Sequence, residues 1–307
     1  MKRVLVILVT HNGMHWLPRC IASVAGADVY VVDNDSTDGS ADYVQANCPG
    51  VKLIRSAENL GFTLANNMGF DYAIAKGYDY VYLLNQDAWL EEGAIEKLVA
   101  AAEAHPEYAV LSPLQMTDGY KELDKQFSYL VKAQKGTQFR NLCHPRHHKR
   151  EGPTQWEGSR SDDSGTVYPS EPYAVKRVMA AHWLMRVEAV KKVGKFCELF
   201  PYYGQDDDWC NRAKYHGWKI GIVPQARAVH DRARRKESKD RIIDRNYRVG
   251  SLVRLCDINR PFWERFLFVC LFTLVKSVKY FSFLPIKHFI GICKKLPDLV
   301  TLRNSYK

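Results

Sequence analysis

The chain has 307 residues, 46% hydrophobic and 25% charged, which excludes a disordered protein and allows one large domain with an appendage or two modest domains. Its net charge of +10 is unevenly distributed. Residues 227–307 contain 19 Lys and Arg against 7 Asp and Glu, so the rest of the chain is nearly neutral. The basic end indicates an anionic partner, such as phospholipid, a pyrophosphate carrier or nucleic acid.

The first part of the chain alternates short apolar strands with helical patterns. Strands are expected at 4–9, 29–32, 51–55 and 80–84, and helices at 17–25, 40–46, 63–76 and 92–105. This alternation predicts βαβ units and an α/β fold with a mixed, mostly parallel sheet. Ligands of such sheets bind beyond the carboxyl ends of the strands, so Thr10, Asp33 and Asp87 are expected on one rim. The apolar run that follows Asp87 is interpreted as helical.

The pattern breaks between about 118 and 172, in a polar, basic segment that is typical of an insertion. Its Cys143, His144, His147 and His148 match no closed four-ligand pattern, which favours a solvated loop over a zinc site. Periodicity returns at 178–187. A helix is then expected at 207–216 and a strand at 220–223, and His230 follows this strand.

Cysteine usage and the N-terminus indicate a cytoplasmic protein. The 8 cysteines form no CxxC pair and are interpreted as reduced thiols. The N-terminal apolar run is short and lacks a small-residue cleavage site, which favours a first strand over a signal peptide.

Two strand ends carry candidate binding groups. No GxGxxG follows the first strand, which disfavours a nicotinamide enzyme. In "VVDNDSTDGS" (31–40), Asp33 and Asp35 either form a turn and helix cap or hydrogen-bond a nucleotide base or ribose. In "LLNQDA" (83–88), Asp87 either caps the next element or binds Mg²⁺ or Mn²⁺ beside a substrate diphosphate.

The run "QDDD" (205–208) is a candidate catalytic feature. Acidic residues at a helix start interact favourably with the helix dipole, but Asp207 and Asp208 are enough for this interaction. Successive helical side chains point about 100° apart, so Asp206 can face a cleft and act as a general base. His230 is either a packed residue or a further metal ligand beside Asp87.

Five stretches together resemble the family 2 glycosyltransferases with the GT-A (nucleotide-diphospho-sugar transferase) fold. The stretches "VTHNG" (9–13), "VVDNDSTDGS", "NLGFTLANNMGF" (59–70) and "LLNQDA" are similar to the nucleotide-sugar half. The acceptor half is resembled by "FPYYGQDDDWCNRAKYHGWKIGIVPQARAVH" (200–230). The resemblance covers roughly residues 3 to 232, and it is specific because the motifs occur in this order and spacing.

The resemblance implies an inverting transfer of a sugar from a nucleotide diphosphate. It implies that Thr10, Asp33 and Asp35 line the nucleotide pocket, and that Asp87 is the second Asp of a DXD-type motif that binds Mg²⁺ or Mn²⁺ and the diphosphate. The neighbouring amides of Asn85 and Gln86 are expected to add hydrogen bonds to the donor without adding charge. It further implies that Asp206 is the base and that His230 approaches the metal.

Three positions depart from the family pattern. Gln86 replaces the first Asp of the metal motif, Gln205 replaces a common Glu, and "MAAHW" (179–183) replaces a glycine before the acceptor strand. The run "QDDDWCNRA" resembles bacterial rhamnosyltransferases of the family. The implied donor is therefore dTDP-rhamnose or a UDP-hexose, and the implied acceptor is a hydroxyl of a saccharide or lipid-linked saccharide in surface polysaccharide synthesis.

The segment after residue 232 is predicted to be a separate basic, amphipathic helical unit (233–307) next to a catalytic domain of 1–232. Its apolar, aromatic stretch at 261–297 is too short and too interrupted by charges to span a membrane. Either it lies in the plane of an anionic membrane surface at the inner face, as a peripheral contact, or it packs on the domain.

Two alternative functions remain at this point. One is a nucleotidyltransferase on a similar sheet. The other is a nucleic-acid-binding protein that uses the basic tail. The long aliphatic runs of the tail are more typical of a lipid-facing surface than of a base-stacking platform, so no nucleic-acid partner is expected.

Overall fold

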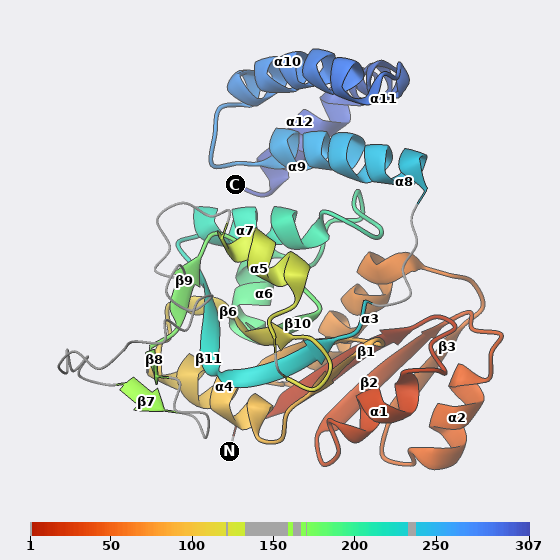
Figure 1. Ribbon diagram of the computed structural model, residues 1–307, viewed down its shortest axis with the longest axis vertical. Helices are drawn as coiled ribbons and strands as arrows, with labels where there is room; N and C mark the ends of the chain where they lie inside the picture. The colour runs from red at the N-terminus through yellow and green to blue at the C-terminus, as the bar shows by residue number, and fades with distance from the viewer. Residues whose placement is uncertain (1, 121, 133–158, 162–166, 170, 233–237) are drawn as a thin grey trace.

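The computed structural model describes residues 2–120, 122–132, 159–161, 167–169, 171–232 and 238–307 (Figure 1). Its centre is a nine-stranded sheet in the order β3-β2-β1-β4-β10-β6-β11-β5, with β9 paired to β11. Both faces of the sheet are covered, because strand residues alternate between two cores. Leu5 and Ile7 belong to one hydrophobic cluster, and Val6 and Leu8 belong to the other.

The first half of the sheet is parallel, as the sequence predicts. It consists of β1(Val4–Thr10), β2(Asp28–Asn34), β3(Lys52–Ser56) and β4(Tyr80–Asn85), connected through α1(Leu17–Ala22), α2(Ser40–Asn47) and α3(Gly61–Ala75). Figure 1 shows α1 and α2 on one face of these strands and α3 on the other. The carboxyl ends of β1, β2 and β4 therefore lie together at one rim.

The second half of the sheet is mixed. It contains β5(Ala88–Leu90), β6(Tyr108–Met116), β9(Tyr173–Val175), β10(His182–Arg186) and β11(Lys219–His230), with α4(Ala94–Ala104), α6(Val187–Val193) and α7(Gln205–Tyr215). Strand β10 runs antiparallel between β4 and β6 and joins the halves. The predicted α/β class with a mixed sheet flanked by helices is confirmed.

The segment 118–172 contains α5(Lys125–Lys132) and two short paired strands, β7(Ser159–Ser161) and β8(Val167–Pro169). The cluster of Cys143, His144, His147 and His148 lies outside the described residues. The described cysteines are all free thiols.

Two local expectations were wrong. The run after Asp87 is strand β5 rather than a helix, because three residues are too few to show a period and they pair with the end of β11. Strand β11 also continues past Val223 to His230. Its register shifts between Val223 and Arg227, around Pro224, which has no N–H to give to a ladder and so falls in the irregular stretch.

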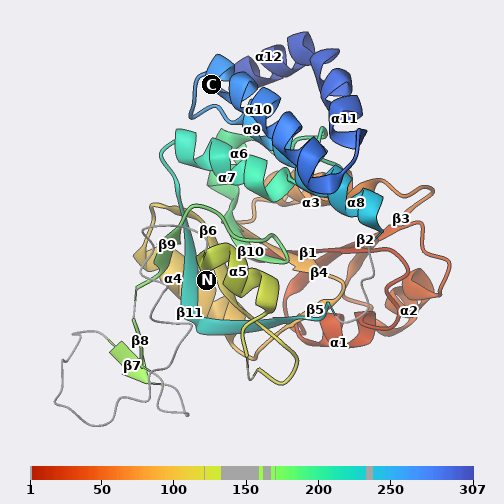
Figure 2. The same cartoon turned by 45° about the horizontal axis from the view of Figure 1, so that its top comes forward.

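The chain ends in a layer of helices stacked on α7, on the side away from the sheet (Figures 1 and 2). This layer comprises α8(Lys239–Ile243), a π-helical segment (Asp244–Val249), α9(Gly250–Cys256), α10(Phe262–Tyr280), α11(Leu284–Cys293) and α12(Leu296–Ser305). Its core includes Cys197 and Phe200 of the loop before α7. Within the parts of the chain that are described, no helix has the length and apolar character needed to cross a bilayer.

Candidate active site

The ends of β1 and β4 are joined by the side chain of Gln86. Its Oε1 accepts hydrogen bonds from Thr10 Oγ1 at 2.9 Å and from the His11 backbone N–H at 2.8 Å, and its Nε2 donates to the His11 carbonyl at 3.2 Å. A Cβ at Gly13 would lie 2.4 Å from Gln86 Oε1, so a side chain at this position would displace the Gln86 amide from these hydrogen bonds. Thr10 and Gln86, both predicted to bind the donor, are therefore engaged with each other and shape the rim.

The end of β2 presents a buried carboxylate. Thr10 and Asp33 are neighbours in the β1–β2 register, and Asp33 is 3% exposed. Its Oδ2 accepts from the Ser36 N–H at 3.1 Å, while its Oδ1 is buried without a hydrogen-bond partner among the described residues. Asp35 lies in an exposed turn with a left-handed φ of 64°. Asp33 thus offers a free acceptor to a ligand N–H or O–H, because buried polar atoms are usually paired.

Asp87 and His230 meet because β5 pairs with the end of β11. Ala88 is the register partner of His230, and the Asp231 N–H donates to the Asp87 carbonyl at 2.8 Å. The His230 Nε2 then lies 3.4 Å from Asp87 Oδ1, with both side chains buried. The predicted metal pair is therefore brought together by a strand pairing that the sequence interpretation had missed.

The side chains of Asp87 and His230 suit a divalent cation that also binds a diphosphate. A carboxylate and an imidazole are suitable ligands for Mn²⁺, and a carboxylate alone suits Mg²⁺. Within the described ranges, no cluster of three or more His, Cys, Asp or Glu side chains could hold a metal ion. An ion held by Asp87 and His230 alone would have most of its coordination positions open to substrate oxygens and water.

Arg232 is a site residue that the sequence interpretation did not find. Its Nη2 lies 3.0 Å from His230 Nδ1, its Nη1 donates to Gln126 Oε1 at 2.7 Å, and its Nε lies 3.3 Å from Asp124 Oδ2. The guanidinium is therefore held beside the Asp87–His230 pair. Its position two residues beyond His230 was the only available signal, and a basic residue in a basic tail does not stand out.

His182 belongs to the stretch "MAAHW", which stands where the family pattern has a glycine. Its Nδ1 lies 2.9 Å from the Tyr82 hydroxyl and its Nε2 lies 2.9 Å from the Val229 carbonyl. Burial lowers the pKa of His182 to about 3, so the ring is neutral, with Nε2–H donating to the carbonyl. This histidine joins β4 and β11 beneath the rim.

The candidate base, Asp206, lies in the first turn of α7 and is partly buried. Its Oδ1 accepts from the Asp207 N–H at 2.9 Å. Burial, together with the charge of Asp207, raises the pKa of Asp206 to about 7. Its two acidic neighbours are engaged: Asp207 pairs with Arg177, and Asp208 forms a buried pair with Arg212 at 2.9 Å. Asp206 is the acid of this run that matches a base working near neutral pH.

The loop before α7 is tied to the donor rim. The Pro201 carbonyl accepts from the backbone N–H groups of Phe62 and Thr63, at 2.9 and 3.1 Å. The Tyr202 hydroxyl donates to Asn59 Oδ1 at 3.4 Å, and that same oxygen accepts from Asn34 Nδ2 at 3.0 Å. Asn34 is the last residue of β2, so the segment that carries Asp206 is fixed to the strand that carries Asp33.

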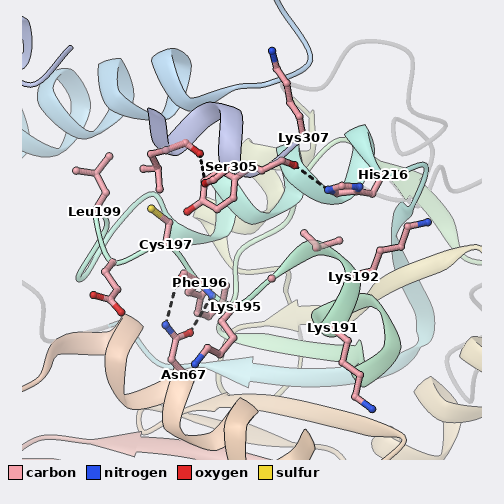
Figure 3. A pocket seen from close by; sticks show the side chains of 15 residues that line it. Asn67, Lys191, Lys192, Lys195, Phe196, Cys197, Leu199, His216, Ser305 and Lys307 are labelled. Atoms are coloured by element: carbon pink, nitrogen blue, oxygen red, sulfur yellow. Dashed lines mark hydrogen bonds between the residues drawn. The ribbon is translucent and has the colours of Figure 1, made fainter. Parts of the chain in front are cut away.

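A surface hollow of about 770 Å³ lies elsewhere, between α6 and the C-terminus (Figure 3). Figure 3 shows Lys191 and Lys192 pointing away from each other, and Lys195 is paired with Asp71 at 2.7 Å. None of the strand-end carboxylates lines this hollow. It is therefore not the donor site.

The sheet, the acidic strand ends and the partly buried acid at the start of α7 together define a glycosyltransferase of the GT-A type. The chain belongs to glycosyl transferase family 2, whose model matches residues 5–194. This confirms the resemblance and the enzyme class, and it sets aside the nucleotidyltransferase alternative.

Relatives and solved structures agree with this assignment. The N-acetylglucosaminyl-diphospho-decaprenol L-rhamnosyltransferase of Mycobacterium tuberculosis is 28% identical over 255 residues, covering 74% of this chain and 76% of the relative. S. aureus TarS 1–349 in complex with UDP has a TM-score of 0.53 at 14% identity, covering 87% of this chain and 69% of TarS. GalNAc-T7 with UDP, GalNAc and Mn²⁺ has a TM-score of 0.55 at 16% identity, covering 85% of this chain and 52% of that one. These structural likenesses confirm the fold.

Proposed function

We propose that this glycosyltransferase moves rhamnose, with inversion, from a nucleotide diphosphate to a hydroxyl of a lipid-linked saccharide in surface polysaccharide synthesis. The observation that carries the chemistry is Asp206, a partly buried acid with a pKa near neutrality in the first turn of α7, just after a loop that is fixed to the donor rim. The choice of rhamnose and of a lipid-linked acceptor follows the mycobacterial relative, whose name states both. A UDP-hexose is the alternative donor.

The donor would bind across the ends of β1, β2 and β4. Asp33 Oδ1 and Asn85 Oδ1 are both buried without hydrogen-bond partners in the described chain, and both are acceptors that a nucleotide can satisfy. Asp35, in the adjacent exposed turn, would contact the nucleotide beside Asp33. The Thr10–Gln86 pair acts indirectly, by fixing the floor of this pocket.

The diphosphate would lie against Asp87, His230 and Arg232. Asp87 and His230 would hold a Mg²⁺ or Mn²⁺ ion, which when bound supplies positive charge to the departing diphosphate. Arg232 adds a fixed positive charge at the same place. With Gln86 in place of the first Asp of the motif, the site has one anionic ligand fewer for the metal, and Arg232 would give the diphosphate a positive partner that does not depend on the metal.

Asp206 would take the proton from the acceptor hydroxyl as its oxygen attacks C1 of the sugar. The new glycosidic bond forms as the bond from C1 to the diphosphate oxygen breaks, on the opposite face, so the configuration inverts. The acceptor resides in a membrane, so the enzyme would work as a peripheral protein at its inner face.

The test is a panel of nucleotide sugars, scored by thermal stabilisation with and without Mn²⁺ and then by transfer to an N-acetylglucosaminyl-diphospho-lipid acceptor. We expect dTDP-rhamnose to stabilise the protein most and to be the donor that is consumed. Stabilisation by a UDP-hexose alone would replace the donor assignment, and lack of transfer to any diphospho-lipid would overturn the acceptor assignment.

A further inference from the structure

The outward face of α10 is apolar. Of the nine exposed residues in this helix, all but Glu264 and Lys279 are large and hydrophobic. Trp263, Leu267, Leu271, Leu274 and Val278 recur at helical spacing, and Trp263 and Val278 are 72% and 71% exposed. Phe268 and Val275 widen the face. We call these seven side chains the α10 stripe. An exposed helix face normally carries polar residues, so a contiguous apolar stripe marks a contact surface.

The opposite face of α10 is fixed to the protein. Val269 is 0% and Thr273 is 4% exposed, and the Thr273 hydroxyl lies 2.5 Å from that of Tyr247. The guanidinium of Arg254 lies 4.8 Å from the ring centre of Phe272. These contacts set the rotation of the helix, so the stripe faces outward because the other side is already packed.

The segment that contains the stripe is basic. Residues 260–307 contain nine Lys and Arg against two Asp and Glu, and Lys279, Lys287, Lys294 and Lys295 are exposed. This charge is complementary to anionic phospholipid headgroups, and it would repel a second copy of the same basic surface. A bilayer therefore fits both the apolar and the charged parts.

The ends of the helix carry exposed aromatic side chains. Trp263 lies at its beginning, while Phe281 and Phe283 lie just beyond its end and are 94% and 85% exposed. A helix of this length measures about 28 Å. Lying in the plane of the membrane, it would place aromatic rings at the headgroup level at both ends.

We propose that the α10 stripe docks on an anionic lipid bilayer, with its apolar side chains entering the headgroup–acyl boundary. This deepens the proposed function, because it brings the enzyme to the surface that holds a lipid-linked acceptor. The segment that leads to α10 also packs closely on the start of α7, which carries the candidate base. A Cβ at Gly204 would lie 2.7 Å from Val249 and 2.9 Å from Val253.

The experiment measures co-sedimentation of the full chain with phosphatidylglycerol–phosphatidylcholine vesicles. We expect Leu271→Glu/Val278→Glu to weaken binding at least tenfold. Lys191→Gln/Lys192→Gln, on α6, changes the net charge by the same two units and should bind nearly as the wild type does. Both variants should retain donor-induced thermal stabilisation, which separates this proposal from failure of the donor assignment.

A second measurement follows Trp263 directly. Brominated lipids should quench part of the tryptophan fluorescence of the wild type. This quenched part should be absent in Trp263→Phe. Equal vesicle binding by wild type and Leu271→Glu/Val278→Glu, or absence of that quenching, would overturn the proposal. So would a wild-type dimer that the double variant dissociates, because a second copy would then cover the stripe.

Discussion

At the scale of single residues, three adjacent acids at the start of α7 have different surroundings. Asp207 and Asp208 are paired with arginines, and Asp206 has a pKa of about 7 because of burial and the charge of Asp207. We expect Asp206→Asn to reduce transfer by about 10²–10⁴-fold while leaving donor binding unchanged, since the amide cannot take the proton. The measurement is kcat alongside donor Kd. If Asp207→Asn lost activity instead, the base would be a neighbour.

The same substitution should also affect stability. The folded-state pKa of Asp206 lies above the usual 3.8, so the native state binds more protons between those values and this group's contribution to stability falls as pH rises through that window. Above pH 7 the charge destabilises the fold. Asp206→Asn should therefore raise the melting temperature at pH 8 by about 2 °C or more and have little effect at pH 4. Equal shifts at both pH values would contradict the pKa argument.

Asp207 should set the pH at which the enzyme becomes active. Its charge raises the pKa of Asp206, and Arg177 beside it lowers that pKa. Asp207→Asn removes the first effect and keeps the second. We expect the acidic limb of the kcat–pH profile, near pH 7 in the wild type, to move to lower pH. A profile that stays in place would mean that another group controls the limb.

Asp87 should control the dependence of donor binding on metal. It is the carboxylate of the Asp87–His230 pair. We expect Asp87→Ala to weaken nucleotide diphosphate binding in Mn²⁺ and to abolish the difference between affinities with and without Mn²⁺. Asp35→Ala, at the exposed turn, serves as a control that should retain this difference. An unchanged metal effect in Asp87→Ala would remove this residue from the metal site.

At the scale of elements, the periodic part of the chain could be predicted and the pairings could not. Strands β1 to β4 were found because each is a run of apolar residues between turn signals. The sequence did not indicate β5. Its three residues form a strand only because they pair with β11. The sequence-based prediction also ended this strand at Val223, although β11 resumes its pairing beyond Pro224. Asp87 and His230 were thus identified by resemblance, and their contact depends on a non-local pairing.

Gln86 illustrates the same limit within the motif. The sequence shows an amide where the family has a carboxylate, and the structure shows that amide joining β1 to β4 through Thr10 and His11. We expect Gln86→Ala to lower the free energy of unfolding by about 2 kcal/mol, since it removes three hydrogen bonds and leaves the buried Thr10 hydroxyl without this partner. Chemical denaturation measures this loss of stability, with Gln45→Ala, at an exposed position of α2, as the control. A loss confined to donor affinity would make Gln86 a direct ligand instead.

At the scale of the whole molecule, the boundary predicted at 232 separates segments that share a core. Val269, Ile292 and Leu299 are buried in the cluster that contains Phe200, from the loop before α7. Arg303 is 3% exposed and donates to the carbonyls of Leu255, Asp257 and Arg260. The composition of the tail, basic and apolar, did not reveal this anchoring, because its buried and exposed residues are both apolar: on α10, buried Val269 lies between Phe268 and Leu271 of the α10 stripe.

Deleting residues 261–307 tests whether this layer is an appendage or part of the fold. The deletion removes three fully buried aliphatic side chains and uncovers Phe200, so we expect the free energy of unfolding to fall by roughly 5 kcal/mol or more. The donor rim is built by other elements, so donor binding should survive at low temperature, whereas transfer should fall because the loop that leads into α7 and Asp206 loses its cover. Urea denaturation, donor affinity and kcat report on these separately. A truncated chain, residues 1–260, that melts like the full one would show that α10 to α12 are an appendage rather than part of the fold. If it melts lower, vesicle binding by the truncated chain no longer reports on the membrane contact, and only the α10 surface variants, which leave the buried face intact, can do so.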